Sequence, residues 1–293
     1  MDIDCLEGTL NKKLIILIPY FGQWPFWMGF FLESCRRNPS ISWRLFTDCG
    51  IPEDCPDNVQ IEAMSFDNYK QKVSKALHIN FNPQSPYKLC DIKPALGLIH
   101  QDEIKAFDFW AFGDLDLVYG DLEAYLTEKR LKFDLISSHR KRVSGHLCLI
   151  RNTVSMNTVF KKIEHWQAKF ENQEHLAFDE KDFSRLFIRL KYWPRWARLI
   201  RYFYKPLLRK AYFQEAYTTN NCTIPWVDGS FNFPKAWVWN NCTISPINSP
   251  IEMPYLHFLY WKCFWTEASI DDISPNADQW LISQQGFSKI RSF

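Results

Sequence analysis

The first constraint on the fold is a short apolar run near the beginning of the sequence. Residues 14–18 read Leu-Ile-Ile-Leu-Ile and are followed directly by Pro19. A continuous run of this length, rich in β-branched residues, is typical of a strand that is buried on both faces, as in a parallel sheet covered by helices. We therefore expect residues 14–18 to form a central parallel strand.

The rest of the first half alternates strand-like and helix-like segments. Apolar or alternating runs predict further strands over residues 43–48, 59–63, 107–112, 133–138 and 145–151. Helical spacing predicts helices over residues 24–37, 67–77, 94–104 and 154–170, the second of them capped by Ser65 or Asp67. This order predicts an α/β fold with a mostly parallel sheet flanked by helices, whose ligands bind at the carboxyl ends of the strands. The proline-rich last third is expected to be irregular and rich in loops.

The composition excludes several classes of protein. The chain is 46% apolar and 17% aromatic with only 10 Gly among 293 residues, which excludes a disordered or collagen-like protein. Its nine cysteines form no Cys-x-x-Cys pair, which argues against a zinc ribbon. The acidic start lacks the layout of a secretory signal, and the longest apolar stretches, 14–18 and 26–32, are far shorter than the roughly 20 residues that span a bilayer. We therefore expect a cytoplasmic protein with reduced thiols and no transmembrane segment.

Two aspartates follow the aromatic strand predicted over residues 107–112. Because side chains alternate along a strand, Asp114 and Asp116 point to the same side. Their hard oxygen ligands suit Mg²⁺ or Mn²⁺, which keep positions open for water and substrate phosphates. An Asp-x-Asp triplet also occurs in solvated turns, but two carboxylates after a buried strand are costly unless charge partners are present. The triplet therefore predicts a divalent-cation site.

Several segments, including this triplet, resemble a known family. Residues 87–94 and 109–122 are similar to bacterial GT-A-type glycosyltransferases encoded with surface-polysaccharide genes, those for lipopolysaccharide O-antigen and capsule. Residues 14–21 and 144–147, and the neighbourhoods of His257 and Lys262, are similar to further segments of the family, whereas the similarity is weaker over residues 185–220. The resemblance implies a GT-A-like, Rossmann-like sheet and a metal-dependent hexose transfer from a UDP-sugar, with UDP-galactose as one candidate. The acceptor would be a lipid-linked or growing cell-surface glycan.

The resemblance also implies how the chain is divided. Residues 1–293 would form a single domain. Its nucleotide-sugar-binding half would cover about residues 12–150, and its acceptor-side half about residues 151–293.

The same resemblance implies roles for residues at the donor diphosphate. Asp116 would be the direct ligand of Mn²⁺ or Mg²⁺, and Asp114 would act through the ribose or a metal-bound water. His257 would complete the metal site, and Lys262 would reach a phosphate. A bridging cation stabilises the charge that develops on a nucleoside diphosphate leaving group. Without the resemblance, the alternative for His257 is an ordinary imidazole in the core or on the surface that binds no metal.

Further candidates surround the donor. Pro19, Tyr20 and Phe21 would line the base pocket, with Asp48 hydrogen-bonding uracil or ribose; ordinary turn packing is the alternative. Asp91 would accept sugar hydroxyl groups or simply cap a helix. Lys93 would face the diphosphate or pair with Asp114.

An inverting enzyme also needs a carboxylate that takes the proton of the acceptor hydroxyl group. The acidic cluster at residues 179–182 offers Asp179 first and Glu180 second. The alternative is a charged helix N-terminus favoured by the helix dipole. A retaining enzyme needs no such base, and the sequence does not decide the stereochemistry.

The basic residues gather in one segment. Residues 185–213 contain nine Lys or Arg and no Asp or Glu, so the formal charge of +2 conceals an acidic remainder. Aromatic and apolar residues recur among these cations at roughly helical spacing. This predicts a basic helical insertion that either lies on an anionic membrane surface or forms a solvated hairpin with an aromatic core. No RNA-binding motif accompanies it, so nucleic acid is not an expected partner.

The sequence thus predicts a glycosyltransferase that works peripherally at the cytoplasmic face of the inner membrane. Two other classes stay open. One is a non-catalytic peripheral-membrane assembly protein that keeps the GT-A-like fold. The other is a nucleotidyl or phosphoryl transferase that uses the same acids.

Overall fold

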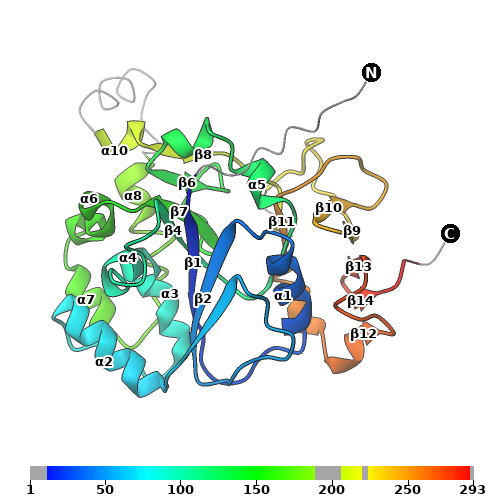
Figure 1. The fold of residues 1–293 in the computed structure, drawn as a ribbon. Coiled ribbons are helices and arrows are strands. Elements are labelled where there is room, and N and C mark those ends of the chain that lie inside the picture. Colours follow the sequence, from blue (N-terminus) through cyan, green and yellow to red (C-terminus); the bar gives the residue numbers. More distant parts are fainter. Residues whose placement is uncertain (1–11, 189–205, 220–223, 291–293) are drawn as a thin grey trace.

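The computed structural model describes residues 12–188, 206–219 and 224–290, and its centre is a seven-stranded sheet with the order β3-β2-β1-β4-β7-β6-β8 (Figure 1). The strands are β1 (Leu14–Pro19), β2 (Ile41–Thr47), β3 (Val59–Ala63), β4 (Phe109–Gly113), β6 (Leu135–Ser137), β7 (Leu147–Arg151) and β8 (Ala211–Phe213). All run in one direction except β7, which is antiparallel to β4 and β6. The predicted α/β fold with a mostly parallel sheet is therefore confirmed.

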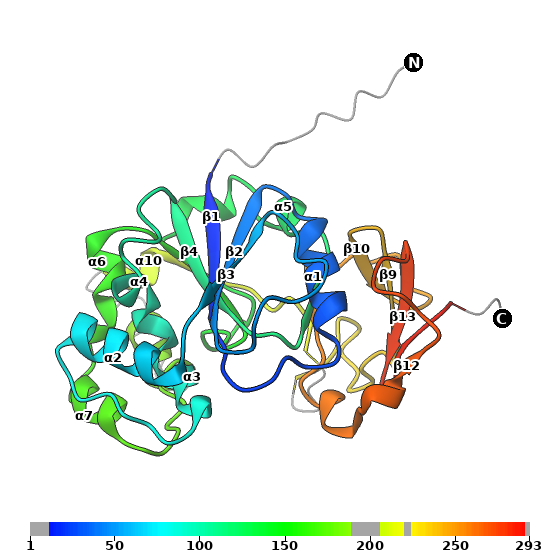
Figure 2. The ribbon, with the colours of Figure 1, turned by 60° about the horizontal axis from the view of Figure 1, so that its bottom comes forward.

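Helices cover both faces of this sheet (Figures 1 and 2). One face packs against α1 (Met28–Arg36) and α5 (Leu122–Tyr125). The other packs against α2 (Phe66–Leu77), α3 (Leu89–Ile92), α4 (Leu96–Ile99), α6 (Val154–Asn157), α7 (Trp166–Glu171) and α8 (Ser184–Phe187). Strand β1 lies between β2 and β4, and its side chains alternate between the two cores: Ile15 and Leu17 face α2, whereas Ile16 and Ile18 face α1. The expected central strand is therefore confirmed.

Two predicted helices are interrupted. Over residues 94–104 the chain forms a 3-10 turn (Lys93–Ala95) and the single turn of α4, where Gly97 lies so close to Trp110 that any side chain would collide with it. Over residues 154–170 it forms α6, a 3-10 turn (Val159–Lys162) and α7, and His165 takes a left-handed conformation with φ 55° just before α7. These short turns all bury apolar residues against one sheet, so the apolar residues recur along the sequence as they would in one long helix. For this reason both predictions of a long helix were wrong.

The last third is more regular than expected. It contains a five-stranded sheet with the order β10-β9-β13-β14-β12. Its strands are β9 (Ala236–Asn240), β10 (Thr243–Pro246), β12 (Ile270–Asp271), β13 (Gln279–Ser283) and β14 (Gly286–Ser288). The alternation of buried Trp237 and Trp239 is a strand pattern that the prolines around it obscured, because those prolines lie at strand ends and in connections.

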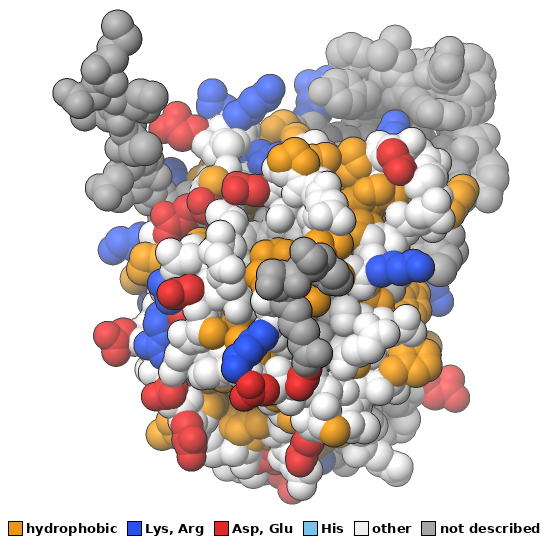
Figure 3. Space-filling model, turned by 90° about the vertical axis from the view of Figure 1, so that its right-hand side faces the viewer, with side chains coloured by type: hydrophobic (Ala, Val, Ile, Leu, Met, Phe, Trp, Pro, Cys, Tyr) orange, Lys and Arg blue, Asp and Glu red, His pale blue; other side chains and the backbone are white. Residues whose placement is uncertain are grey.

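A third core joins this sheet to the rest of the molecule. Phe30 of α1 packs with Trp280 and Phe287 of the C-terminal sheet, and Val118 lies in the same cluster. Val118 belongs to β5 (Leu117–Tyr119), which pairs antiparallel with β11 (Tyr255–His257). On the face over the C-terminal sheet, acidic, basic and apolar side chains are interspersed (Figure 3).

The predicted basic helical segment lies mostly outside the described residues. Its described parts are the end of α8, the short helix α10 (Pro206–Arg209) and strand β8, which pairs parallel with β6. Residues 211–213 are therefore an edge strand of the main sheet rather than part of a helix. Among the described residues, no helix has the length and apolar character needed to cross a membrane.

Candidate functional site

A cavity of about 680 Å³ opens where β1 and β4 end. The final residues of both strands, Pro19 and Gly113, are in its wall. Ten residues singled out from the sequence also line it: Pro19, Tyr20, Phe21, Lys93, Asp114, Asp116, Asp179, Glu180, His257 and Lys262. The cavity therefore lies at the edge of the sheet where ligands of α/β folds bind.

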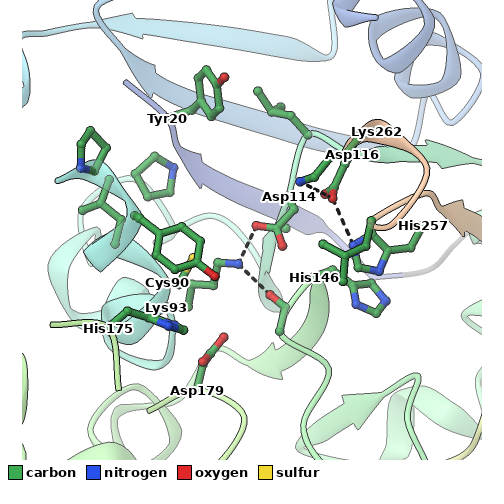
Figure 4. Close-up of a pocket in the computed structure, with 18 of the residues that line it drawn as sticks. Tyr20, Cys90, Lys93, Asp114, Asp116, His146, His175, Asp179, His257 and Lys262 are labelled. Carbon is green, nitrogen blue, oxygen red and sulfur yellow. Dashed lines mark hydrogen bonds and ion pairs between the residues drawn. The ribbon is translucent and has the colours of Figure 1, made fainter. Parts of the chain in front are cut away.

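Asp116 is brought together with two residues from the end of the chain (Figure 4). It directly precedes β5, and the pairing of β5 with β11 places His257 beside it. Asp116 is only 4% exposed, and its Oδ2 lies 2.7 Å from Lys262 Nζ and 3.2 Å from His257 Nε2. Burial alone would raise the pKa of the Asp116 carboxyl group, but His257 and Lys262 outweigh it and hold the pKa below its ordinary value. Asp116 is therefore a carboxylate at neutral pH.

The Asp116 and His257 pair fits a divalent cation. Asp116 Oδ2 and His257 Nε2 are both buried, and apart from the ion pairs that Asp116 makes with His257 and Lys262, neither atom has a hydrogen-bond partner among the described residues. The other ring nitrogen of His257, Nδ1, lies 3.0 Å from Thr219 Oγ1, a partner that fixes the ring with Nε2 next to Asp116. A carboxylate oxygen beside an imidazole nitrogen suits Mn²⁺ better than Mg²⁺, which prefers oxygen ligands throughout.

Asp114 is paired with a buried lysine. Its Oδ1 lies 2.5 Å from Lys93 Nζ, which also donates a hydrogen bond of 2.8 Å to the Gly145 carbonyl oxygen. Burial acts to lower the pKa of Lys93, but nearby Asp114, Cys90 and Asp179 raise it above its ordinary value. Of the two arrangements expected for Lys93, the described structure has the pairing with Asp114.

Asp179 lies across the cavity from the Asp-x-Asp triplet (Figure 4). Its side chain is 3% exposed, and burial raises its pKa to about 7. Gly145 makes room for it, because a Cβ atom at that position would lie 2.9 Å from Asp179 Oδ2 and 3.0 Å from Glu180 Oε1. Glu180 is an ion-pair partner of Arg142, at 2.7 Å. Asp179 is thus a buried carboxyl group that exchanges a proton near neutral pH.

Two predicted residues, Asp48 and Asp91, are outside the cavity wall. Asp48 is exposed and accepts a hydrogen bond of 2.8 Å from Gly22 N, which shapes the turn after β1. Asp91 is fully buried: Lys88 Nζ and Leu176 N donate to its Oδ2, and Phe178 N donates to its Oδ1. It therefore anchors the segment that carries Asp179.

A second group of potential ligands includes Asp91, His175 and Asp179, whose ligand atoms lie within 4.8 Å of one another. His175 Nε2 is 3.6 Å from Asp91 Oδ1. Lys88 and two backbone amides donate to the oxygens of Asp91, so this carboxylate is already engaged in contacts within the protein.

The structure adds residues that sequence reasoning did not single out. His146 is 3% exposed, stacks on His257 with ring centroids 3.9 Å apart, and lies 2.8 Å from the Tyr255 hydroxyl oxygen. Tyr87 lines the cavity and packs against His175. Trp24, which was not singled out either, stacks on the predicted cavity residue Tyr20. A single histidine or tyrosine gives no periodic signal; the only sequence signal for Tyr87 and His146 is that both lie in segments, 87–94 and 144–147, that resemble the glycosyltransferase family.

Comparisons of the chain with known proteins find one matching family and several solved structures that are distantly similar. No curated protein matches the chain. The apo form of the glycosyltransferase GlyE from Streptococcus pneumoniae TIGR4 is similar with a TM-score of 0.34 and 14% identity, over 71% of this chain and 46% of GlyE. Mouse xyloside xylosyltransferase 1, also in its apo form, is similar with a TM-score of 0.36 and 10% identity, over 71% of this chain and 86% of that one.

The chain spans less than half of GlyE, and likenesses this distant do not bear on activity. The match to a family is broader. The model of a family of unknown function, DUF6625, matches residues 16–291, which include every residue of the candidate site. The chain therefore belongs to the DUF6625 family.

Proposed function

We propose that the protein is a metal-dependent glycosyltransferase that moves a hexose from a UDP-sugar onto a glycan. One observation carries this proposal: a single cavity joins the Asp116 and His257 pair, two lysines and, on its far side, a carboxyl group with a pKa of about 7. A nucleoside diphosphate sugar presents the matching features, with an anionic diphosphate at one end and a sugar at the other.

On the donor side, Asp116 and His257 would hold the cation, and Asp114 would act through a metal-bound water or the ribose. The bound ion would stabilise the negative charge of the departing diphosphate. Lys262, whose side chain is 33% exposed, is free enough to bind a phosphate oxygen. Tyr20, stacked on Trp24, offers an aromatic surface for the base, with Pro19 and Phe21 beside it.

On the acceptor side, Asp179 would take the proton of the attacking hydroxyl group. A carboxyl group with a pKa of about 7 is partly ionised at neutral pH and is a stronger base than an ordinary aspartate. This role applies if the configuration is inverted. If the enzyme retains configuration, Asp179 and Glu180 would instead bind hydroxyl groups of the donor sugar.

The acceptor in this proposal is a lipid-linked or growing cell-surface glycan, reached from the cytoplasmic face of the inner membrane. The basic, aromatic segment 185–213 supports docking to an anionic surface, because it concentrates nine cations without a single acid.

The test is a panel of nucleotide sugars with Mn²⁺, scored by thermal stabilisation and by slow hydrolysis that releases the nucleoside diphosphate. A ligand at about 100 times its dissociation constant stabilises the fold by about 2.7 kcal/mol, so modest affinity is detectable. Asp116→Ala is expected to abolish both signals, and Asp116→Asn tests the same point with the side-chain volume kept. Asp102→Ala is the matched control, because Asp102 lies in an exposed ion pair with Lys105 outside the cavity wall.

Different products would point to different classes. Release of pyrophosphate or inorganic phosphate would indicate nucleotidyl or phosphoryl transfer. Binding without any turnover would indicate a non-catalytic protein. Unchanged hydrolysis with intact UDP and Mn²⁺ binding in Asp116→Ala would overturn the metal assignment.

A further inference from the structure

The two carboxylates of the Asp-x-Asp triplet each face a lysine, but the two lysines are held differently. Lys93 is 7% exposed and is fixed by both Asp114 and the Gly145 carbonyl oxygen. Lys262 is 33% exposed, and among the described residues its ammonium group forms one ion pair, with Asp116. Lys262 is therefore the lysine that can leave its carboxylate.

Lys262 contacts the same oxygen that would face a cation. Both its Nζ and His257 Nε2 approach Asp116 Oδ2, at 2.7 and 3.2 Å. A divalent cation taken up by Asp116 and His257 would lie next to the ammonium group, and the like charges would repel strongly in this buried position. The cation and the Lys262 ammonium group therefore compete for Asp116.

The surroundings of Lys262 allow it to move. It begins the 3-10 helix Lys262–Phe264 (η5) at the cavity wall, and the next two residues, Cys263 and Phe264, are exposed. An anionic diphosphate in the cavity would give the displaced ammonium group a new partner in place of Asp116.

From this geometry we infer that Lys262 makes the uptake of the divalent cation depend on the diphosphate, so that the site binds the metal–diphosphate complex as a unit. The inference rests on the proposed function and adds the form in which the substrate is recognised. Without a diphosphate, Lys262 holds Asp116 and the cation binds weakly. With it, Lys262 moves to the phosphate and Asp116 becomes free to coordinate. Since coupling between two ligands is reciprocal, the cation strengthens diphosphate binding by the same factor.

The experiment is a calorimetric titration of the full chain with Mn²⁺, with and without UDP. In the wild type, UDP is expected to raise the affinity for Mn²⁺ by about tenfold or more, within the usual range of such coupling. Lys262→Met, which keeps the aliphatic chain and removes the charge, is expected to bind Mn²⁺ alone about tenfold more tightly and to lose most of the effect of UDP.

Three further variants control the test. Lys262→Arg keeps the charge and is expected to keep a UDP-dependent gain in the affinity for Mn²⁺ that the charge-free variants lose. Lys105→Ala removes a lysine from an exposed pair outside the cavity wall and is expected to leave every affinity unchanged. Lys262→Gln repeats the test with a polar side chain if thermal unfolding shows that Lys262→Met loses its fold.

Two results would overturn the inference: UDP that leaves the Mn²⁺ affinity of the wild type unchanged, or charge-free variants that bind Mn²⁺ no more tightly than the wild type. A failure of the proposed function looks different. The wild type would then bind no nucleotide with Mn²⁺, whereas the Mn²⁺ titration of Lys262→Met would still decide whether Lys262 competes with the ion.

Discussion

At the scale of single residues, the protonation of the carboxyl groups in the cavity depends on the charges buried beside them. Asp116 is kept ionised by His257 and Lys262, whereas Asp179, an equally buried carboxyl group, has its pKa raised to about 7. Gly145 contributes by having no side chain, which leaves room for Asp179 and Glu180. Two aspartates in one cavity therefore have different protonation at neutral pH, which is the separation that acid–base chemistry requires.

Asp179 leads to a pH prediction. If Asp179 acts as the base, transfer by the wild type rises as the pH increases through about 7, and Asp179→Asn lowers the rate by about a hundredfold or more. The measurement is kcat/KM against pH for both proteins. Asp182→Asn is the control, because Asp182 lies on the same segment but pairs with Lys169 and Arg185 outside the cavity wall.

Asp179→Asn, which is expected to lower the rate of transfer, is expected to raise the stability of the fold. A carboxyl group whose pKa is raised on folding from 3.8 to about 7 favours the folded state below pH 3.8, and that contribution is lost as the pH rises to about 7. Asp179→Asn is therefore expected to unfold at a higher temperature than the wild type at pH 7 to 8. A rate that does not depend on Asp179, or a variant that is less stable at every pH, would contradict the structural assignment.

At the scale of elements, turns and strand pairings place the functional side chains. Strand β4 ends at Gly113, the Asp-x-Asp follows, and β5 then leaves the main sheet to pair with β11. Asp116 lies at this change of partner, so one short antiparallel pairing brings His257 to it. The element that supplies the aspartates and the one that supplies the histidine are thus held by backbone hydrogen bonds rather than by loops alone.

The structure shows which of the two predicted residues caps α2, and the assignment can be tested. Ser65 Oγ accepts a hydrogen bond of 3.2 Å from Asn68 N at the start of α2, whereas Asp67 forms an exposed ion pair with Lys70. Ser65→Ala is expected to lower the free energy of unfolding by about 1 kcal/mol, measured by urea denaturation. Asp67→Ala, as the matched variant, is expected to change it by less than about 0.5 kcal/mol. The reverse order would show that Asp67 is the effective cap.

Elements were predictable from the sequence where one local pattern determines them. The central strand β1 follows from its continuous apolar run, and the place of the Asp-x-Asp triplet at the end of β4 follows from the aromatic strand before it. The break before α7 was not predictable, because it depends on the left-handed conformation of one residue, His165. His146 was not singled out because its stacking on His257 is a contact between residues far apart in the sequence.

At the scale of the whole molecule, α1 joins two of the three cores. Phe31 of this helix packs against the main sheet, and Phe30 packs against the C-terminal sheet. The basic segment 185–213 enters the main sheet through β8, at the edge next to β6. A surface bound by that segment would therefore be tied directly to the sheet whose strands end at the cavity.

This connection gives the prediction for the whole molecule. The protein is expected to sediment with vesicles that contain anionic lipids, and the bound fraction is expected to fall as salt screens the charges. Reversing the charges of Arg195, Arg198 and Arg201 should abolish sedimentation while leaving nucleotide binding unchanged. If the charge-reversed variant still sediments, the basic segment is not the docking element.

The pairing of β5 with β11 also bears on how the protein is made. Asp116 is translated long before His257, and the two meet only when β11 has paired with β5. A nascent chain that has not yet reached β11 lacks half of the candidate cation site and has only an isolated Asp-x-Asp turn. Cation affinity would therefore appear late in synthesis, and it would mark the moment when β11 has docked onto β5.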